Sequence, residues 1–333
     1  MQKDLVSIII PAFNRADVLA ETMNSFLAQT YKQWECIIVD DGSTDDTETI
    51  VKNLSQKDSR FQFHKRPNNR AKGANACRNY GFEVSQGEFI NWFDSDDIAA
   101  PGFLSEKVAM LQKDGTLDMA AGYGEVFYAD GRPNLNVCPV DDYTNNEVEN
   151  YILHDFCFYT NSPLWRKSYL LEKNEFFDEN LHRGQEKDLH FRLVIKGIRY
   201  IRFKEFPLFY KRGDNKSIST QAGSSLKAKK SVFEFRDKQF QILKSIENPS
   251  KNKLNEYLFY RQATLYYDMI QTANAQERAE VYKHYFPKLK AMIGESHIDS
   301  SFGRKIRFGN WMLKLFKKGY KFFYFKQFDY RSF

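Results

Sequence analysis

The chain has 333 residues, of which 42% are hydrophobic and 28% charged, enough apolar material for one large core or two smaller ones. No run approaches the roughly 18 consecutive apolar residues that span a bilayer, the N-terminus lacks the features of a signal peptide, and the four cysteines form no CxxC pair or disulfide framework, so we expect a cytoplasmic protein. The net charge of +6 is uneven, with +8 in residues 301–333 and −2 in the rest of the chain, which argues against nucleic acid as a partner of the whole protein.

Short apolar runs alternate with helical patterns over roughly the first 100 residues. The runs that predict strands are residues 5–10, 34–39, 61–65 and 88–93. Helices are predicted over residues 17–29 and 72–84. A capping box of Ser43 and Asp46 predicts the start of another helix between these two, and Pro101 is expected to be the first residue of a fourth. This alternation predicts an α/β fold in which helices flank a mostly parallel central sheet.

The pattern is less regular after residue 102. It predicts a helix to about residue 112, a strand over 119–128, a helix over 186–196, and strands over 198–203 and 206–211. Long helices follow over 224–245 and 253–272, so the C-terminal region is expected to be mainly helical. We therefore expect a first domain over 1–220, a helical region over 221–300 and a basic, aromatic tail over 301–333.

Acidic loops follow two of the predicted strands. Asp40 and Asp41 come after the second strand, and Asp94, Asp96 and Asp97 come after the fourth. Ligands of open parallel sheets bind beyond the carboxyl ends of the strands, which is where these loops would lie. Clustered carboxylates raise one another's pKa unless a cation joins them, so the second cluster could hold a divalent metal that bridges to a nucleotide diphosphate. Solvated acidic turns are the alternative interpretation of both clusters.

Five consecutive segments resemble family 2 glycosyltransferases, the inverting enzymes of the GT-A fold that use nucleotide-sugars. The segments are VSIIIPAFN (6–14), SFLAQTY (25–31), IVDDGSTD (38–45), GANACRNYG (73–81) and GEFINWFDSDD (87–97). The resemblance is specific over about 100 residues and weaker to about residue 219. It implies that residues 1–220 form a nucleotide-sugar-binding catalytic domain of the GT-A type.

The resemblance also implies which residues bind the nucleotide. Pro11 and Ala12 would line its pocket through their backbone groups. Asp41, with Asp40 beside it, would hold the base, which is commonly uracil in this family. Arg78 would lie near the nucleotide or its phosphates.

The loop after the fourth predicted strand matches the DxD element of the family. Asp94 and Asp96 would form this element, with Ser95 between them. The resemblance implies that Asp96 is the more direct ligand of Mn²⁺ or Mg²⁺ and that Asp94 assists it. Asp97 would bind through water or position the loop.

An inverting transfer also needs a base that takes the proton of the acceptor hydroxyl. Residues 177–193 resemble the base-bearing region of the family, where the pair Glu-Asp precedes a helix. The pair here is Gln185-Glu186, followed by Asp188, so Glu186 is the expected base and Asp188 the alternative. A plain helix-terminal acid is the other interpretation of Glu186, because the helix dipole favours an acid in the first turn.

A charged loop follows the last strand predicted in the first domain. In the family, a flexible loop at this place often closes over the diphosphate. Arg212 and Lys216 are therefore candidate donor ligands, and an exposed charged turn is the alternative.

The tail over 301–333 combines twelve aromatic residues with nine basic ones. The two faces of a predicted helix are a basic one, with Lys314, Lys317, Lys318 and Lys321, and an apolar one, with Trp311, Leu315 and Phe322. Such a helix suits an anionic membrane surface, where a lipid-linked acceptor would be held. Packing of its aromatic residues on the rest of the protein and an RNA-binding tail are the alternatives.

The resemblance and the acidic loops together predict a metal-dependent inverting glycosyltransferase. It would move a sugar from a nucleotide-diphosphate donor, expected to be a UDP-sugar, to a hydroxyl of a glycan or lipid-linked acceptor. Cell-surface polysaccharide or glycolipid synthesis at the inner face of the membrane is the expected setting. Two other functions stay open: a protein of the same fold that binds nucleotide-sugars without turnover, as Gln185 would allow, and a sugar nucleotidyltransferase, whose Gly-rich basic loop is not found after the first strand.

Overall fold

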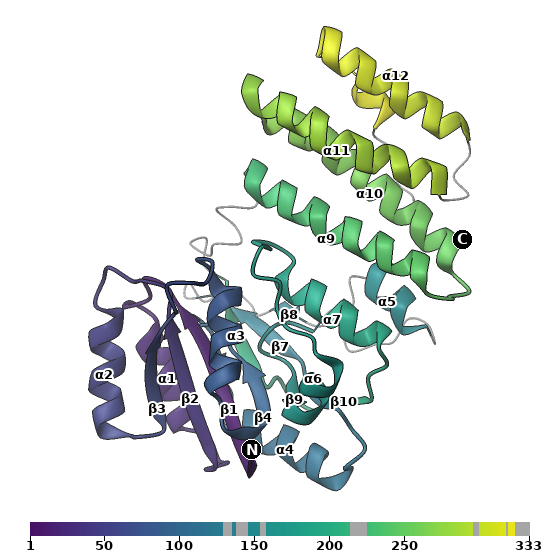
Figure 1. Cartoon of the computed structure of the whole chain (residues 1–333). Coiled ribbons are helices and arrows are strands. Elements are labelled where there is room, and N and C mark those ends of the chain that lie inside the picture. Colours follow the sequence, from purple (N-terminus) through teal and green to yellow (C-terminus); the bar gives the residue numbers. More distant parts are fainter. Residues whose placement is uncertain are drawn as a thin grey trace. The chain divides into compact units, whose positions relative to one another are not determined.

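The computed structural model describes residues 1–128, 135–137, 146–153, 158–213, 225–295, 300–317 and 319–323 (Figure 1). Two compact units divide the chain. Unit 1 comprises Met1–Val148, Phe156–Asn180 and Gln185–Asn215, and unit 2 comprises Glu149–Asp155, Leu181–Gly184 and Lys216–Phe333. The candidate site residues lie in unit 1, except Lys216, which falls outside the described residues.

A seven-stranded sheet forms the centre of unit 1 (Figure 1). Its strands, in spatial order, are β10 (Tyr200–Phe203), β6 (Met119–Gly122), β9 (Leu164–Arg166), β4 (Gly87–Trp92), β1 (Gln2–Ala12), β2 (Trp34–Asp40) and β3 (Phe61–Lys65). Every neighbouring pair is parallel except the pairs that β9 makes with β4 and β6. The predicted mostly parallel sheet is thereby confirmed.

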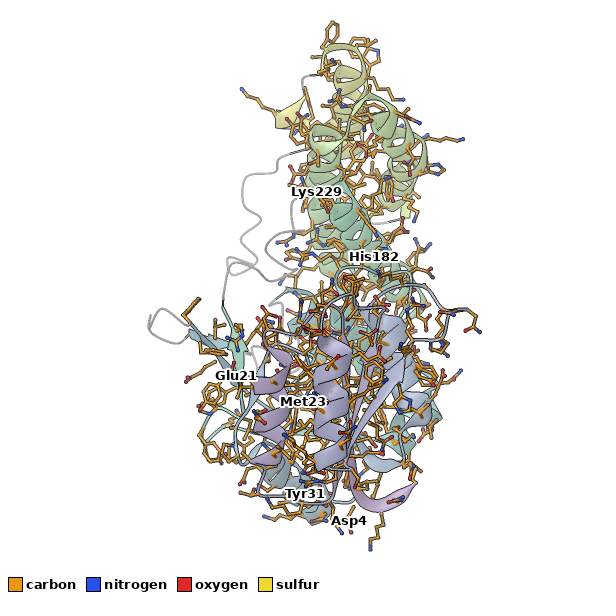
Figure 2. The ribbon with its side chains drawn as sticks, turned by 90° about the vertical axis from the view of Figure 1, so that its left-hand side faces the viewer. Asp4, Glu21, Met23, Tyr31, His182 and Lys229 are labelled. Carbon is orange, nitrogen blue, oxygen red and sulfur yellow. The ribbon has the colours of Figure 1, made fainter. Side chains whose placement is uncertain are left out.

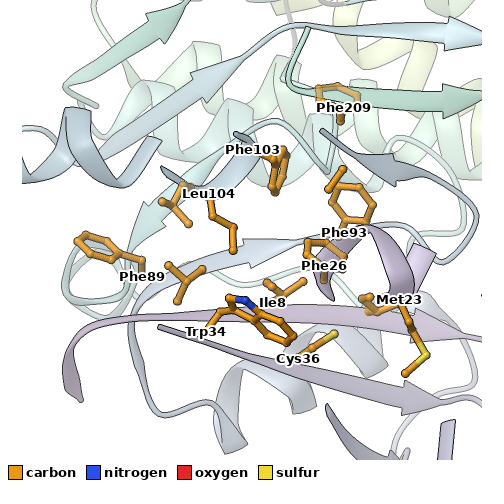
Figure 3. Close-up of a cluster of buried hydrophobic side chains, with 14 of the residues drawn as sticks. Ile8, Met23, Phe26, Trp34, Cys36, Phe89, Phe93, Phe103, Leu104 and Phe209 are labelled. Atoms are coloured by element: carbon orange, nitrogen blue, oxygen red, sulfur yellow. The ribbon is translucent and has the colours of Figure 1, made fainter. Parts of the chain in front are cut away.

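One face of this sheet packs against α1 (Leu19–Leu27) and α4 (Phe103–Lys113). Phe26 of α1 and Phe103 of α4 are fully buried over Ile8 of β1 (Figure 3). Phe93, which follows β4, meets Phe26 edge-to-face with ring centroids 5.0 Å apart. These aromatic contacts hold the loop after β4 against α1.

The opposite face of the sheet packs against α3 (Ala74–Val84). Cys77 of α3 lies in a buried cluster with Ile37 and Val39 of β2. Gly81 approaches β1 so closely that a Cβ there would overlap the Ile9 side chain. Helices thus cover both faces of the strands, which explains why their apolar runs are continuous rather than alternating. The close approach of α3 to β1 also fixes the position of Arg78.

A smaller sheet lies beside the first one in unit 1. It has the order β5 (Ile98–Ala99), β11 (Phe209–Arg212), β7 (Gly124–Phe127) and β8 (Leu135–Val137). The single strand predicted over 119–128 is wrong, because the chain passes from β6 in one sheet to β7 in the other at Tyr123. The glycines on either side of Tyr123 permit this change, since a Cβ at Gly122 or Gly124 would clash with Leu208 or Phe209.

Two predicted helix starts in unit 1 are also wrong. α2 (Thr47–Lys57) has no capping box, because the Ser43 hydroxyl accepts from the Asn14 N–H at 2.9 Å instead of capping the helix. α4 begins at Phe103, so Pro101 precedes the helix rather than occupying its first position. The described ranges also contain the short helices α5 (Glu147–Leu153), most of which belongs to unit 2, α6 (Lys167–Lys173) and α7 (Gln185–Ile195).

Unit 2 is mainly helical, as the sequence predicts. Its long helices are α9 (Leu226–Ser245), α10 (Lys251–Thr272), α11 (Ala275–Glu295) and α12 (Ser300–Phe316), followed by the 3-10 turn η1 (Tyr320–Phe322). Each long helix packs against the next along the chain (Figure 1). None of the helices in the described part of the chain has an apolar stretch long enough to cross a bilayer.

The tail does not form the single helix that its face pattern predicts. Lys317 and Gly319 both have positive φ, so the chain leaves the helical path after Phe316. Phe322 in η1 then turns back onto Phe308, with ring centroids 5.2 Å apart. Lys321 and Phe322 therefore do not extend the faces of α12, and Lys318 and residues 324–333 lie outside the described residues.

Candidate active site

The carboxyl ends of β1 and β2 form the first part of the site. These parallel strands pair Ala12 with Asp40, so their ends lie side by side. The Asp41 N–H donates to the Ala12 carbonyl at 2.8 Å, and the side chains of Pro11 and Ala12 are buried. The backbone of Ala12 thus links the end of β1 to the loop after β2.

The two carboxylates after β2 have different partners. Asp40 accepts from the N–H groups of Gly42 and Ser43 at 2.9 and 3.0 Å, so it closes its own turn. Asp41 accepts from Arg66 Nε at 2.5 Å through Oδ1, and no other described residue donates to Oδ2. Asp41 is therefore the better placed of the two to accept a hydrogen bond from a ligand.

Arg66 is a site residue that the sequence analysis missed. It follows β3 directly, and its N–H donates to the Asp40 carbonyl at 2.9 Å. Its guanidinium also donates to the carbonyls of Pro67 and Arg70, at 3.0 and 2.6 Å. The sequence could have indicated Arg66, because a basic residue that directly follows a parallel strand lies at the same edge of the sheet as the other candidate residues.

The loop after β4, here called the acidic loop, brings Asp94 and Asp96 to this edge. The Phe93 N–H donates to the Ile9 carbonyl of β1 at 2.9 Å, which extends the pairing of the two strands. Ser95 is buried, and its carbonyl accepts from the Thr22 hydroxyl of α1 at 3.0 Å. Asp94 and Asp96 are both partly exposed on either side of it.

Asp97 holds the loop in place from inside the protein. It is 1% exposed, and burial raises the pKa of its carboxyl to about 7. Its two oxygens accept from the Arg212 N–H at 2.9 Å and from Asn161 Nδ2 at 2.6 Å. Asn161 in turn accepts from the Asp94 N–H at 2.8 Å, so one amide side chain joins both ends of the acidic loop.

Asp96 is the carboxylate of the loop with the fewest partners. No other described residue donates a hydrogen bond to its side chain. Burial raises its pKa, the charge of Asp94 raises it further, and the cations Arg15 and Lys211 oppose this shift. A partly buried carboxylate held next to another one is suited to binding a cation.

Lys211 of β11 is a second residue that the sequence analysis missed. Burial alone would lower the pKa of its ammonium group, but the three carboxylates of the acidic loop raise it above the ordinary value. Lys211 is therefore charged, and it compensates part of the negative charge of the loop. Its position depends on the pairing of β11 with β5 and β7, which no local pattern predicts.

Arg212 also lies at the acidic loop, although much of its guanidinium is already engaged. Its Nε donates to the Asp96 carbonyl at 3.2 Å, and its Nη2 forms an ion pair with Glu21 of α1. Glu21 is labelled in Figure 2, on the side of unit 1 that carries α1. Arg212 thus ties the acidic loop to β11 and α1.

Arg78 joins the acidic loop to the start of α7. Its Nη2 donates to Asp94 Oδ1 at 2.9 Å, and its Nη1 donates to Gln185 Oε1 at 3.0 Å. The guanidinium also lies over the ring of Phe177, 5.1 Å from its centroid. The residue expected to contact phosphate therefore also positions the helix that carries both candidate bases.

The two candidate bases lie in different surroundings on α7. Asp188 is 2% exposed and accepts from Arg192 Nη2 at 2.8 Å. Burial raises the pKa of the Asp188 carboxyl to about 7. Glu186 is partly exposed, directly after Gln185 in the first turn of the helix. Its carboxylate is the one that an acceptor could reach.

The acidic loop could hold a divalent cation only with help from a ligand. No group of three or more His, Cys, Asp or Glu side chains in the described ranges could hold a metal ion by itself. Asp96 and the Oδ2 atom of Asp94 would supply two oxygens. Mg²⁺ and similar ions are commonly bound by one or two carboxylates together with substrate phosphates, so these residues fit that type of site.

A family model supports the motifs described above. Residues 7–170, about half of the chain, match the model for glycosyl transferase family 2. The curated relative WfaP of Escherichia coli, a UDP-Glc:alpha-D-GlcNAc-diphosphoundecaprenol beta-1,3-glucosyltransferase, is 42% identical over 109 residues, which are 33% of this chain and 42% of WfaP. Relatives from Rickettsia, Escherichia coli and Haemophilus influenzae that are 32% to 43% identical are matched over only 17% to 58% of their own length.

Two solved structures resemble the fold over most of the chain. The TarS fragment 1–349 of S. aureus, in complex with UDP-GlcNAc, has a TM-score of 0.67 at 16% identity and covers 96% of this chain and 89% of its own. The mannosyltransferase PcManGT of Pyrobaculum calidifontis, in complex with GDP-Man and Mn²⁺, has a TM-score of 0.54 at 15% identity, with 96% and 82% covered. At these identities the similarity establishes the fold alone, which is that of GT-A-like glycosyltransferases.

Proposed function

Because the chain belongs to glycosyl transferase family 2, we propose that it transfers a sugar from a nucleotide-diphosphate donor to a hydroxyl group with inversion at the anomeric carbon. The donor is a UDP-sugar, and the acceptor is a glycan or lipid-linked saccharide used in cell-surface polysaccharide or glycolipid synthesis. Two relatives support this choice: the name of WfaP gives UDP-Glc as donor and a diphosphoundecaprenol acceptor, and the TarS fragment is in complex with UDP-GlcNAc.

One juxtaposition carries the proposal. Asp41 and the acidic loop lie at the same edge of the sheet, where a nucleotide and its diphosphate would bind. Arg78 connects Asp94 of this loop to Gln185, the residue before Glu186. The Arg78 side chain therefore connects the proposed donor site to the start of the helix that carries the partly exposed Glu186 carboxylate.

The proposed mechanism assigns a separate task to each group. Asp41 accepts a hydrogen bond from the base. Asp94 and Asp96 would hold Mn²⁺ or Mg²⁺, which would offset the negative charge of the leaving diphosphate. Lys211 and Arg78 add fixed positive charge beside the same loop. Glu186 takes the proton of the acceptor hydroxyl while the hydroxyl oxygen bonds to the anomeric carbon and the bond from that carbon to the diphosphate oxygen breaks.

A thermal-shift screen tests the donor site. UDP-Glc, UDP-GlcNAc and GDP-Man are each added with and without Mn²⁺ to the wild type and to Asp96→Asn. At about a hundred times its Kd, a ligand adds about 2.7 kcal/mol to the free energy of unfolding. We expect one UDP-sugar to raise the Tm in the presence of Mn²⁺, and Asp96→Asn to lose this shift.

A surface acid outside the site provides the matched control for this screen. Asp114→Asn changes an exposed carboxylate in the loop after α4 and should retain the full shift. A wild type that no nucleotide-sugar stabilises would contradict the proposed donor site. Donor binding without nucleotide release, across glycan and diphosphoundecaprenol acceptors, would favour the non-catalytic binding protein instead.

A further inference from the structure

The outer face of α12 carries large apolar side chains that are about half exposed, although Phe308 also meets the Phe322 ring of η1. Phe308, Trp311 and Leu315 are 50%, 50% and 59% exposed. They are spaced three and four residues apart, so they form one stripe along the helix. Phe308 and Trp311 stack with ring centroids 5.6 Å apart. We call these three residues the outer stripe.

The opposite side of α12 anchors the helix to the rest of unit 2. Ile306 and Leu313 are 0% and 1% exposed. Asn310, on the same side, accepts from the Tyr266 hydroxyl of α10 at 2.6 Å. α12 is therefore held by one stripe and presents the outer stripe about half a turn away from it. Packing on unit 2 buries Phe323 of the tail fully but leaves the outer stripe about half exposed.

Basic side chains flank the outer stripe. Arg304, Lys305, Arg307 and Lys314 are exposed on α12, and Lys317 is exposed just after it. The sequence of α12 contains no Asp or Glu. An apolar stripe with aromatic residues, on a helix whose charged side chains are all basic, has the chemistry of a helix that lies in the interface of an anionic bilayer.

We propose that the outer stripe of α12 and its flanking cations dock unit 2 on a membrane that contains anionic lipids. The aromatic side chains would enter the headgroup boundary, and the cations would contact the phosphates beside them. The charge complementarity favours lipid over a second copy of the chain, because two copies would bring their positive charges together. Docking would bring the enzyme to a lipid-linked acceptor, and only this consequence rests on the proposed function.

Vesicle flotation tests the docking, with vesicles of about 30% phosphatidylglycerol in phosphatidylcholine compared with phosphatidylcholine alone. The wild type should float only with the anionic vesicles, and about 1 M salt should release it. Replacing Arg304, Arg307 and Lys314 by Gln should lower partitioning roughly a hundredfold, since each charge contributes about a fivefold factor. The variant Phe308→Ser/Trp311→Ser/Leu315→Ser should also lose flotation. Both variants keep the inner residues that hold α12 in place.

Matched controls come from unit 1. The variant Leu171→Ser/Ile201→Ser/Phe206→Ser removes three apolar side chains of similar exposure, 49%, 40% and 44%. The variant Lys3→Gln/Lys57→Gln/Lys113→Gln removes three exposed charges. Both should float like the wild type. These point variants are preferable to deletion of the tail, because deletion would expose the residues of α10 that α12 covers.

Several outcomes would overturn the docking proposal. It fails if the wild type stays with the soluble fraction, or if the serine variant of the outer stripe still floats. It also fails if the wild type is a dimer that the serine variant converts to a monomer, or if RNA competes the protein off the vesicles. Donor-induced Tm shifts measured without lipid separate this failure from failure of the proposed function.

Discussion

Arg78 Nη2 lies 2.9 Å from Asp94 Oδ1, so a side chain of α3 holds the first carboxylate of the acidic loop. The same guanidinium reaches Gln185 at the start of α7 with its other terminal nitrogen. Arg78 Nε is buried and has no hydrogen-bond partner among the described residues. Arg78 is thus a bridge that depends on its planar, two-armed head group, which a lysine cannot reproduce.

Arg78→Lys tests the importance of this bridge. A single ammonium can keep one of the two contacts, so the start of α7 should lose its fixed distance from the acidic loop. Since a hydrogen bond involving a charged group contributes about 1.5–3 kcal/mol, we expect kcat to fall by roughly tenfold to a hundredfold. Steady-state kinetics of nucleotide release measure this loss.

Arg166→Lys is the matched control for this change. Arg166 pairs with Glu88 at 3.2 Å and donates to the Leu117 carbonyl at 2.8 Å, away from the acidic loop. The Arg166→Lys change should lower the free energy of unfolding about as much as Arg78→Lys does, while leaving kcat within about twofold of the wild type. Equal losses of kcat in the two variants would mean that Arg78 acts only through stability.

Asp97 and Asn161 allow an exchange of side chains. Asp97→Asn places an amide where two N–H donors converge, so one buried donor loses its partner and stability should fall by about 1–3 kcal/mol. Adding Asn161→Asp restores an acceptor for both the Asp94 N–H and the new amide. Urea unfolding of the single and double variants should therefore show recovery of most of the loss.

Lys211→Met should change how donor binding depends on pH. Lys211 opposes the rise in the pKa of Asp96 and Asp97, so its removal should raise both values. Because a cation binds the ionised carboxylates, the loss of donor binding on acidification, measured with Mn²⁺ present, should occur at a higher pH than in the wild type. Titrations between about pH 6 and pH 8.5 test this shift.

The charge-conserving variant Lys211→Arg serves as the control for that experiment. It should keep the profile of the wild type, because a cation remains next to the acidic loop. An unchanged profile in Lys211→Met would show that Lys211 has only a structural role.

The sequence predicted the parallel half of the fold well because its signals are local. β1 and β2 contain continuous apolar runs, and Asp41 and Gly42 follow β2 directly, so a few neighbouring residues are enough to predict each of these strands. β9 has only three residues and enters the sheet antiparallel between β4 and β6. A strand of this length has no measurable period, and its partners are distant in sequence.

In the candidate site, too, the residues that lie in local motifs could be predicted, whereas their partners from distant segments could not. The sequence pointed to Asp94 and Asp96 because they lie together after a predicted strand and match the DxD element of the family that the sequence resembles. The partners of these residues come from distant segments, as with Arg66 for Asp41, Asn161 for Asp97 and Lys211 for the acidic loop. Long-range pairings of this kind follow from the fold and have no signature in the local sequence.

The most direct test of the account compares donor binding and turnover in Glu186→Gln. In the proposed mechanism Glu186 acts only on the acceptor hydroxyl. Calorimetry should therefore give the wild-type Kd for the UDP-sugar, while nucleotide release falls by about a hundredfold to ten-thousandfold. Asp188→Asn should mainly lower stability, since it breaks a buried pair with Arg192. An active Glu186→Gln enzyme together with an inactive but folded Asp188→Asn enzyme would contradict the assignment of the base.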